Sequence, residues 1–215
     1  MYSYRFDPKG LIEDDALRIA EKEWPLFTRV HNAGGQAVCQ TRPAIFMTMR
    51  CSQFMAWTPA LRLSYECDLD AAIAEGRNLL EEKYAYMMAY THSDEFARLR
   101  PCLPSVSPEK AALINSLIDI TLHWANEMAH KYPALMRSSR PISSDQDGWD
   151  TSIETYSRGE MMTYSEHTLA CMLEHYRHMK AQGINLLEVT DGITARLYGY
   201  DSLAEAEQAA VTLLR

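Results

Sequence analysis

Apolar residues recur three and four positions apart along most of the chain, which is the spacing of helices that bury one face. No pair of alternating apolar runs flanks a hairpin turn, and β-branched clusters are scarce, so strands are not expected. The pattern predicts about six main helices, at about 14–27, 43–57, 70–90, 108–131, 157–182 and 202–214, with a short helical turn at 93–99. Because no linker is long enough to divide the chain, the sequence predicts an all-α fold, a single compact multi-helix domain over residues 1–215.

Local signals mark several of these boundaries. Ser107 followed by Pro108 is typical of a helix start, because serine caps the first turn and proline suits its first position. Gly183 is typical of a helix end. Ser202 with Glu205 forms the pattern of a capping box at the start of the last helix.

The predicted helix at 43–57 is apolar almost all round, which indicates a central position in the fold. It nevertheless carries Arg50 and Gln53. An unpaired charge inside a protein is very costly, so the Arg50 guanidinium must pair with a carboxylate or with a bound anion.

The segment 151–165 concentrates hydrogen-bonding side chains at the mouth of a long helical pattern. The groups are two carboxylates, an arginine and two tyrosines: Glu154, Tyr156, Arg158, Glu160 and Tyr164. Either they satisfy one another in the interior or they hold a ligand. Glu160 or Glu154 would serve as a general base if desolvation raised its pKa.

The predicted helix at 70–90 offers further candidates. Arg77 falls at the edge of its apolar stripe, within reach of Glu81 one turn later. Asn78 and Glu82 fall on the opposite side and are expected to be solvated, whereas Lys83 joins the candidate ligand-binding groups.

Two rows of potential metal ligands form an alternative site. They are His123, Glu127 and His130 on one predicted helix, and Glu160, His167, Glu174 and His178 on another. The first spacing is similar to the His-x-x-x-Asp-x-x-His helix of haem-oxygenase-like di-iron oxidases, and two facing rows would make a di-metal site. Both rows lie opposite the apolar stripes of their helices, however, which favours exposed faces.

Composition restricts the partners. Lys and Arg number 21 against 29 Asp and Glu, giving a net charge of -8, which argues against binding DNA or RNA. Five cysteines without a C-x-x-C pair are typical of reduced thiols in the cytoplasm. No apolar run approaches the roughly 18 residues that span a bilayer, so a soluble, cytoplasmic protein without membrane contact is expected.

Several blocks of the sequence resemble a known family. They are Glu23-Trp24, Asn32-Ala33-Gly34-Gly35, Met49-Arg50-Cys51-Ser52-Gln53, Gly76-Arg77-Asn78-Leu79-Leu80, Glu154-Thr155-Tyr156 and Thr163-Tyr164-Ser165. Together, from about 23 to 169, they resemble the bacterial domain-of-unknown-function family four-one-two-five. The resemblance implies no activity. It implies a helical companion to nucleotide chemistry, with a nucleotidyltransferase-like protein as partner, by association alone.

The residues therefore support three hypotheses. The first is a polar cavity that binds, or binds and transforms, a small anionic or nucleotide-like ligand clamped by Arg50 and Arg77. Its other ligand-binding candidates are Gln53, Asn78, Lys83, Tyr156, Arg158 and Tyr164, with Glu160 and Glu154 as catalytic groups. The second is a di-metal, iron-dependent oxidase. The third is a structural or partner-binding module in which the same residues form a closed ion-pair network.

Overall fold

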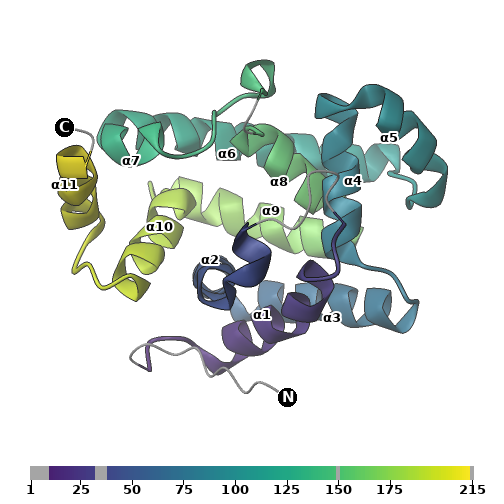
Figure 1. Cartoon of the computed structure of the whole chain (residues 1–215), viewed down its shortest axis with the longest axis horizontal. Coiled ribbons are helices and arrows are strands. Elements are labelled where there is room, and N and C mark those ends of the chain that lie inside the picture. The colour runs from purple at the N-terminus through teal and green to yellow at the C-terminus, as the bar shows by residue number, and fades with distance from the viewer. Residues whose placement is uncertain (1–9, 32–37, 149–150, 214–215) are drawn as a thin grey trace.

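The computed structural model describes residues 10–31, 38–148 and 151–213, and over these residues the chain forms eleven α-helices, three short 3₁₀ turns and no strand (Figure 1). The helices are α1 (Asp14–Phe27), α2 (Pro43–Met55), α3 (Pro59–Ala74), α4 (Leu79–Thr91), α5 (Ser93–Leu99), α6 (Pro108–Lys131), α7 (Pro133–Arg137), α8 (Ile153–Met161), α9 (Glu166–Ala181), α10 (Leu186–Leu197) and α11 (Leu203–Leu213). The all-α prediction is confirmed, but the expected number of about six helices is too low.

The strongest local signals act as predicted. α1 has the expected bounds, and α6 begins where the Ser107 hydroxyl accepts a hydrogen bond from the Lys110 N–H at 3.0 Å. The Ser202 hydroxyl likewise accepts from the Glu205 N–H at 3.2 Å before α11.

Two predicted helices are each divided by a corner. The predicted helix at 70–90 breaks between α3 and α4, and the one at 157–182 breaks between α8 and α9. At the second break, Ser165 caps α9 by accepting from the Thr168 N–H, and its own N–H donates to Asp68. A side-chain cap at each new start replaces the hydrogen bonds that a continuous helix would have made.

The same five-residue corner occurs twice, as Gly-x-Asn-Leu-Leu. Gly76 and Gly183 have φ of 74° and 70°, a left-handed conformation that ends α3 and α9. Two residues later, Asn78 and Asn185 cap α4 and α10 through their side-chain oxygens. Each asparagine also donates to a distant carbonyl, Asn78 to that of Leu26 and Asn185 to that of Trp124, both at 2.9 Å. These corners therefore fix the direction of the chain and join it to a remote helix.

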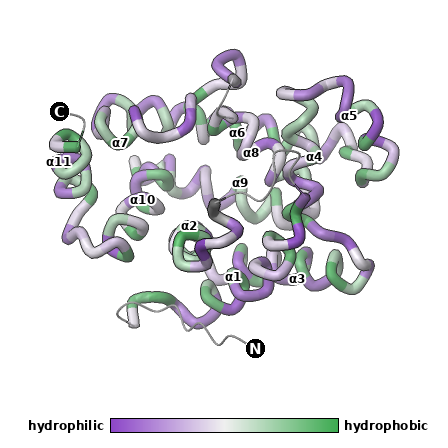
Figure 2. Tube along the Cα trace, in the orientation of Figure 1, coloured by the Kyte–Doolittle hydropathy of each residue, from purple (hydrophilic) through white to green (hydrophobic). Residues whose placement is uncertain are grey.

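α2 lies in the middle of the view in Figure 1, where it packs against α1 and α10. α4 packs against α8, and α9 packs against both α3 and α6. α7 and α11 contact each other at one end of the molecule, while α5 projects at the other end and buries no residue fully. Hydrophilic and hydrophobic residues alternate along most helices, as expected for helices that each bury one face (Figure 2).

A glycine allows α8 to approach α4 closely. A Cβ atom added to Gly159 would lie 2.8 Å from the backbone oxygen of Lys83 and 2.5 Å from the Cγ of Met87. No side chain fits in that space, so the bare backbone at Gly159 brings the neighbouring Glu160 next to Lys83.

Candidate functional site

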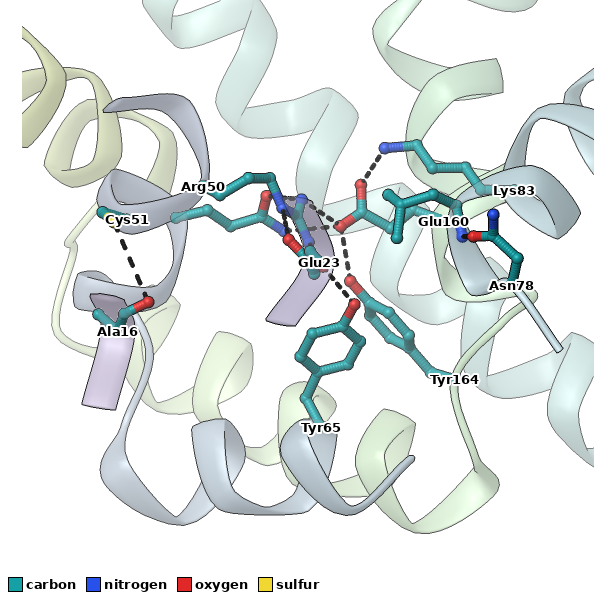
Figure 3. A network of polar contacts seen from close by, with 11 residues as sticks. Ala16, Glu23, Arg50, Cys51, Tyr65, Asn78, Lys83, Glu160 and Tyr164 are labelled. Carbon is teal, nitrogen blue, oxygen red and sulfur yellow. Dashed lines mark hydrogen bonds and ion pairs between the residues drawn. The ribbon is translucent and has the colours of Figure 1, made fainter. Parts of the chain in front are cut away.

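Arg50 lies at the centre of a buried group of polar side chains, with only 6% of its surface exposed. Its guanidinium makes a bidentate pair with Glu23 of α1, through Nε to Oε2 and Nη2 to Oε1, both at 2.6 Å. Its Nη1 donates to Glu160 of α8 at 2.8 Å and to Gln53 at 2.7 Å (Figure 3). The prediction that Arg50 is buried against a carboxylate is confirmed.

Glu160 accepts hydrogen bonds from several sides. Lys83 of α4 donates to its Oε2 at 2.6 Å, and the Tyr164 hydroxyl donates to its Oε1 at 2.7 Å. Figure 3 shows the Glu160 carboxylate between these two groups. Glu23 receives a second donor, the hydroxyl of Tyr65.

The four charged members, Glu23, Arg50, Lys83 and Glu160, are named the ionic cluster below. Two cations face two carboxylates, so the cluster carries no net charge. Each partner is supplied by a different helix, which makes the cluster a cross-link between α1, α2, α4 and α8. A buried charge is tolerated when it is paired and hydrogen-bonded in this way.

The electrostatics of the cluster bear on the expected role of Glu160. Burial alone would raise the pKa of Glu160, but the nearby charges of Arg50 and Lys83 outweigh burial and lower that pKa. Burial would likewise lower the pKa of Lys83, and Glu160 raises it instead. The condition set for general-base action by Glu160, a pKa raised by desolvation, is therefore not met, because two cations favour its ionised carboxylate.

Glu154 and Arg158 pair with each other and do not line a cavity. The Arg158 Nε donates to Glu154 at 3.0 Å, and the Ser144 N–H donates to the other carboxylate oxygen. Burial favours a higher pKa for Glu154, but these hydrogen bonds prevail and lower it. Arg158 also donates to Asn115. The condition set for general-base action by Glu154, a raised pKa, is therefore not met, and neither residue lines the cavities described below.

Arg77 and Asn78 lie apart from Arg50. Arg77 forms a bidentate pair with Glu82 at 2.8 Å, not with Glu81 as predicted, and Glu82 is buried rather than solvated. Asn78 is occupied as the cap of α4. Both line a separate hollow of about 380 Å³, together with His31.

A larger cavity of about 570 Å³ opens beside the ionic cluster. Its apolar walls are formed by Phe27, Ile45, Phe46, Met49, Leu80, Met128, Met136, Ile153 and Leu187. Its polar lining groups are Arg50, Lys83, Tyr84, Ser138, Ser139, Arg140, Tyr156, Ser157 and Asp191. A smaller cavity of about 190 Å³ shares Arg50, Tyr156 and Ser157 with it and is also lined by Gln53, Glu160 and Tyr164. Six of the ten residues predicted from sequence as a site thus border these two cavities.

Two charged residues of the larger cavity were not singled out in the sequence. Arg140 stacks on Tyr156, with its Cζ 4.6 Å from the ring centroid, and donates from Nη1 to the Thr151 carbonyl. No hydrogen bond or ion pair joins the Asp191 carboxylate to another described residue, and burial raises the pKa of Asp191 to about 6. Asp191 belongs to α10, a helix that the periodicity did not predict, and only the Gly-x-Asn corner before it marks that helix in the sequence.

The two rows of potential metal ligands do not face each other. α6 and α9 pack through their apolar sides, where the Trp124 and Tyr176 ring centroids are 5.0 Å apart. The six candidates outside the ionic cluster are exposed: His123, Glu127, His130, His167, Glu174 and His178. Within the described ranges, no three His, Cys, Asp or Glu residues are grouped so as to hold a metal ion.

The fold and the cluster define an all-helical protein with a neutral buried ionic cluster beside a cavity. The chain belongs to the family described as protein of unknown function (DUF4125), whose model matches residues 13–208. The resemblance drawn from residues 23–169 is confirmed and extends further in both directions. No curated protein and no solved structure matches the chain. Among the described helices, none is both long and apolar enough to cross a bilayer.

Proposed function

We propose that this protein binds a small organic ligand with an apolar body and an anionic group in the larger cavity. The observation that carries the proposal is the cavity itself, about 570 Å³ with mainly apolar walls and a few polar groups. Ligand sites typically enclose roughly 300–1,000 Å³ and have this mixed lining. The proposal keeps the class of ligand expected from the sequence, including nucleotide-like molecules. It assigns the anionic group of the ligand to Arg140 instead of Arg50 and Arg77.

Arg140 is the cation best placed for the ligand. Arg50 and Lys83 also line the cavity, but their charges are already balanced by Glu23 and Glu160. Arg140 has no carboxylate partner among the described residues, and only its Nη1 is engaged, by a backbone carbonyl. Stacking on Tyr156 holds its planar group in place, and its other N–H donors suit a carboxylate, sulfonate or phosphate.

The test is a titration with 1-anilinonaphthalene-8-sulfonate, an aromatic anion whose fluorescence rises in apolar surroundings. Saturable binding near one equivalent is expected for the folded protein, with weaker binding in Arg140→Gln. Ser157→Phe and Met49→Trp place bulk beside both cavities and should also weaken it. Met49 is 52% exposed, so its replacement leaves the core intact if Ser157→Phe does not fold.

Ala170→Phe is the matched control, because Ala170 is exposed on α9 and lines neither cavity. Near-ultraviolet circular dichroism would establish that each variant remains folded, since partly unfolded proteins also bind the dye. Binding that is absent, or that Met49→Trp and Arg140→Gln leave unchanged in folded protein, would refute the proposal.

A structural role for the ionic cluster is a second candidate function, favoured by its closed and neutral arrangement. In that case Arg50→Met or Glu160→Gln damages folding, whereas a direct ligand role predicts lost binding with the fold kept. The cavity lies beside the cluster, so a structural cluster and a ligand site are compatible. Association with a nucleotidyltransferase-like protein stays a prediction.

A further inference from the structure

The larger cavity contains one acidic group that its neighbours do not neutralise. Four charged residues line it: Arg50, Lys83, Arg140 and Asp191. The first two belong to the ionic cluster. Asp191 is half-buried in the middle of α10, and no described side chain pairs with it.

The Asp191 carboxylate would become unfavourable once a ligand fills the cavity beside it and displaces the water. Ionised groups removed from water require an opposite charge or several hydrogen bonds. The rise in the pKa of Asp191 is caused by burial and by no neighbouring charge, which fits a carboxylate that lacks a partner within the chain. Groups with a shifted pKa concentrate at functional sites.

Building on the proposed function, we propose that the ligand is a zwitterion: a basic nitrogen pairs with Asp191, an acidic group pairs with Arg140, and an apolar body fills the space between them. The class comprises amino acids with large apolar side chains and short apolar peptides. A purely anionic ligand would satisfy Arg140 and leave Asp191 unpaired, whereas a zwitterion leaves no uncompensated charge in the cavity.

The apolar walls indicate the chemistry of the remaining part of the ligand. Phe27, Phe46 and Leu80 line the cavity together with Met128 and Leu187, so an aliphatic or aromatic side chain of the ligand would be buried there. A small hydrophilic zwitterion such as glycine would leave these walls in contact with water and should bind weakly.

The test is displacement of the fluorescent dye, followed by calorimetry, with the dipeptide Leu-Phe, phenylalanine and leucine at about pH 7, where both termini are charged. N-acetyl-Leu-Phe lacks the cation, and Leu-Phe amide lacks the anion. Each should bind about tenfold more weakly than Leu-Phe, because a charged hydrogen bond contributes enough for a tenfold change in affinity.

Variants assign each end of the probe. Asp191→Asn should weaken Leu-Phe about tenfold yet leave N-acetyl-Leu-Phe nearly unchanged, since that probe has no cation to lose. Arg140→Gln should weaken Leu-Phe about tenfold and leave Leu-Phe amide nearly unchanged, since that probe has no carboxylate to lose. Asp119→Asn, an exposed change on α6 away from the cavity, is the control and should alter neither affinity. Asp191→Asn should not lower the melting temperature, because Asp191 has no partner to lose.

Three results would overturn the inference. The first is equal binding of Leu-Phe and its N-acetyl form. The second is a loss in Asp191→Asn that is the same for both probes. The third is dye binding in the cavity that no zwitterion of the panel displaces, in which case the proposed function stands and this inference falls. Failure of the dye as well would remove both.

Discussion

Replacing Glu160 by glutamine tests whether the ionic cluster holds the fold together. Glutamine keeps the shape of the side chain and removes its charge, so Lys83 would lose its carboxylate partner and the cluster would hold two cations against the single carboxylate of Glu23. Glu160 accepts from Arg50, Gln53, Lys83 and Tyr164 in the native protein, and the amide nitrogen would oppose some of these donors. Breaking a buried pair typically costs about 3–5 kcal/mol, a large share of the roughly 5–15 kcal/mol that stabilises a domain.

A second substitution separates charge balance from simple loss of contacts. Lys83→Met alone leaves two carboxylates facing Arg50, whereas Lys83→Met with Glu160→Gln leaves only the neutral pair of Arg50 and Glu23. The double variant should therefore be less destabilised than the sum of the two single variants, by about 1–3 kcal/mol. Lys131→Met, at an exposed pair with Glu188, is the control and should change stability by less than about 1 kcal/mol.

The assay is urea unfolding followed by circular dichroism and tryptophan fluorescence, with coincident curves as the check for two-state behaviour. The reasoning fails if Glu160→Gln unfolds within about 0.5 kcal/mol of the native protein, the range of ordinary surface substitutions. It also fails if the two single effects simply add, because charge balance would then contribute nothing.

Further predictions concern packing, pH and thiol reactivity. Gly159→Ala should lower the free energy of unfolding by about 1–3 kcal/mol, because its methyl group collides with α4, whereas Gly192→Ala, in a helix with open space around it, should raise it by about 0.5–1 kcal/mol. Lowering the pH from about 7 to 5 should add about 1 kcal/mol of stability through Asp191, because its pKa is raised to about 6 in the folded state and protonation there favours folding; in Asp191→Asn this contribution should vanish. Below about pH 4.3 stability should fall, because the lowered pKa of Glu160 makes its ionised form part of the fold, and a urea midpoint that keeps rising there would contradict this. Mass-spectrometric mapping of brief thiol labelling should find Cys67 modified and Cys51 untouched, because burial raises the pKa of Cys51 to about 12; early labelling of Cys51 would count against its burial.

The sequence was sufficient to place Arg50, because a charge within an apolar helix has few physical options. It was also sufficient to find Glu160, since the density of polar groups near it required a buried explanation. Glu23 was not found as the main partner, because α1 reads as an ordinary amphipathic helix and the pairing joins residues 27 positions apart. Contacts of that range are set by how helices pack, which periodicity along one segment does not reveal.

The missed helix boundaries have a different cause. Both Gly-x-Asn corners carry a local signal, but apolar residues continue at helical spacing on either side of Gly76, so the period alone favoured one long helix. Asp191 was missed for a different reason: Gly183 was expected to end a helix, but no helix was predicted after it, so α10 was not recognised. Reading the glycine and the asparagine together, as an end followed by a start, would have located both corners.

The spacing of the ionic cluster along the chain also bears on synthesis of the protein. Lys83 leaves the ribosome 77 residues ahead of Glu160. At roughly 5–20 residues per second, the growing chain spends about 4–15 s with two cations and one acid of the cluster available. During that interval the Lys83 charge on α4 lacks its partner Glu160, so burying α4 would leave that charge unpaired. Docking of α4 must therefore await the emergence of α8. Nascent chains of this protein are thus expected to pass through a stage at which apolar surface is open to chaperones.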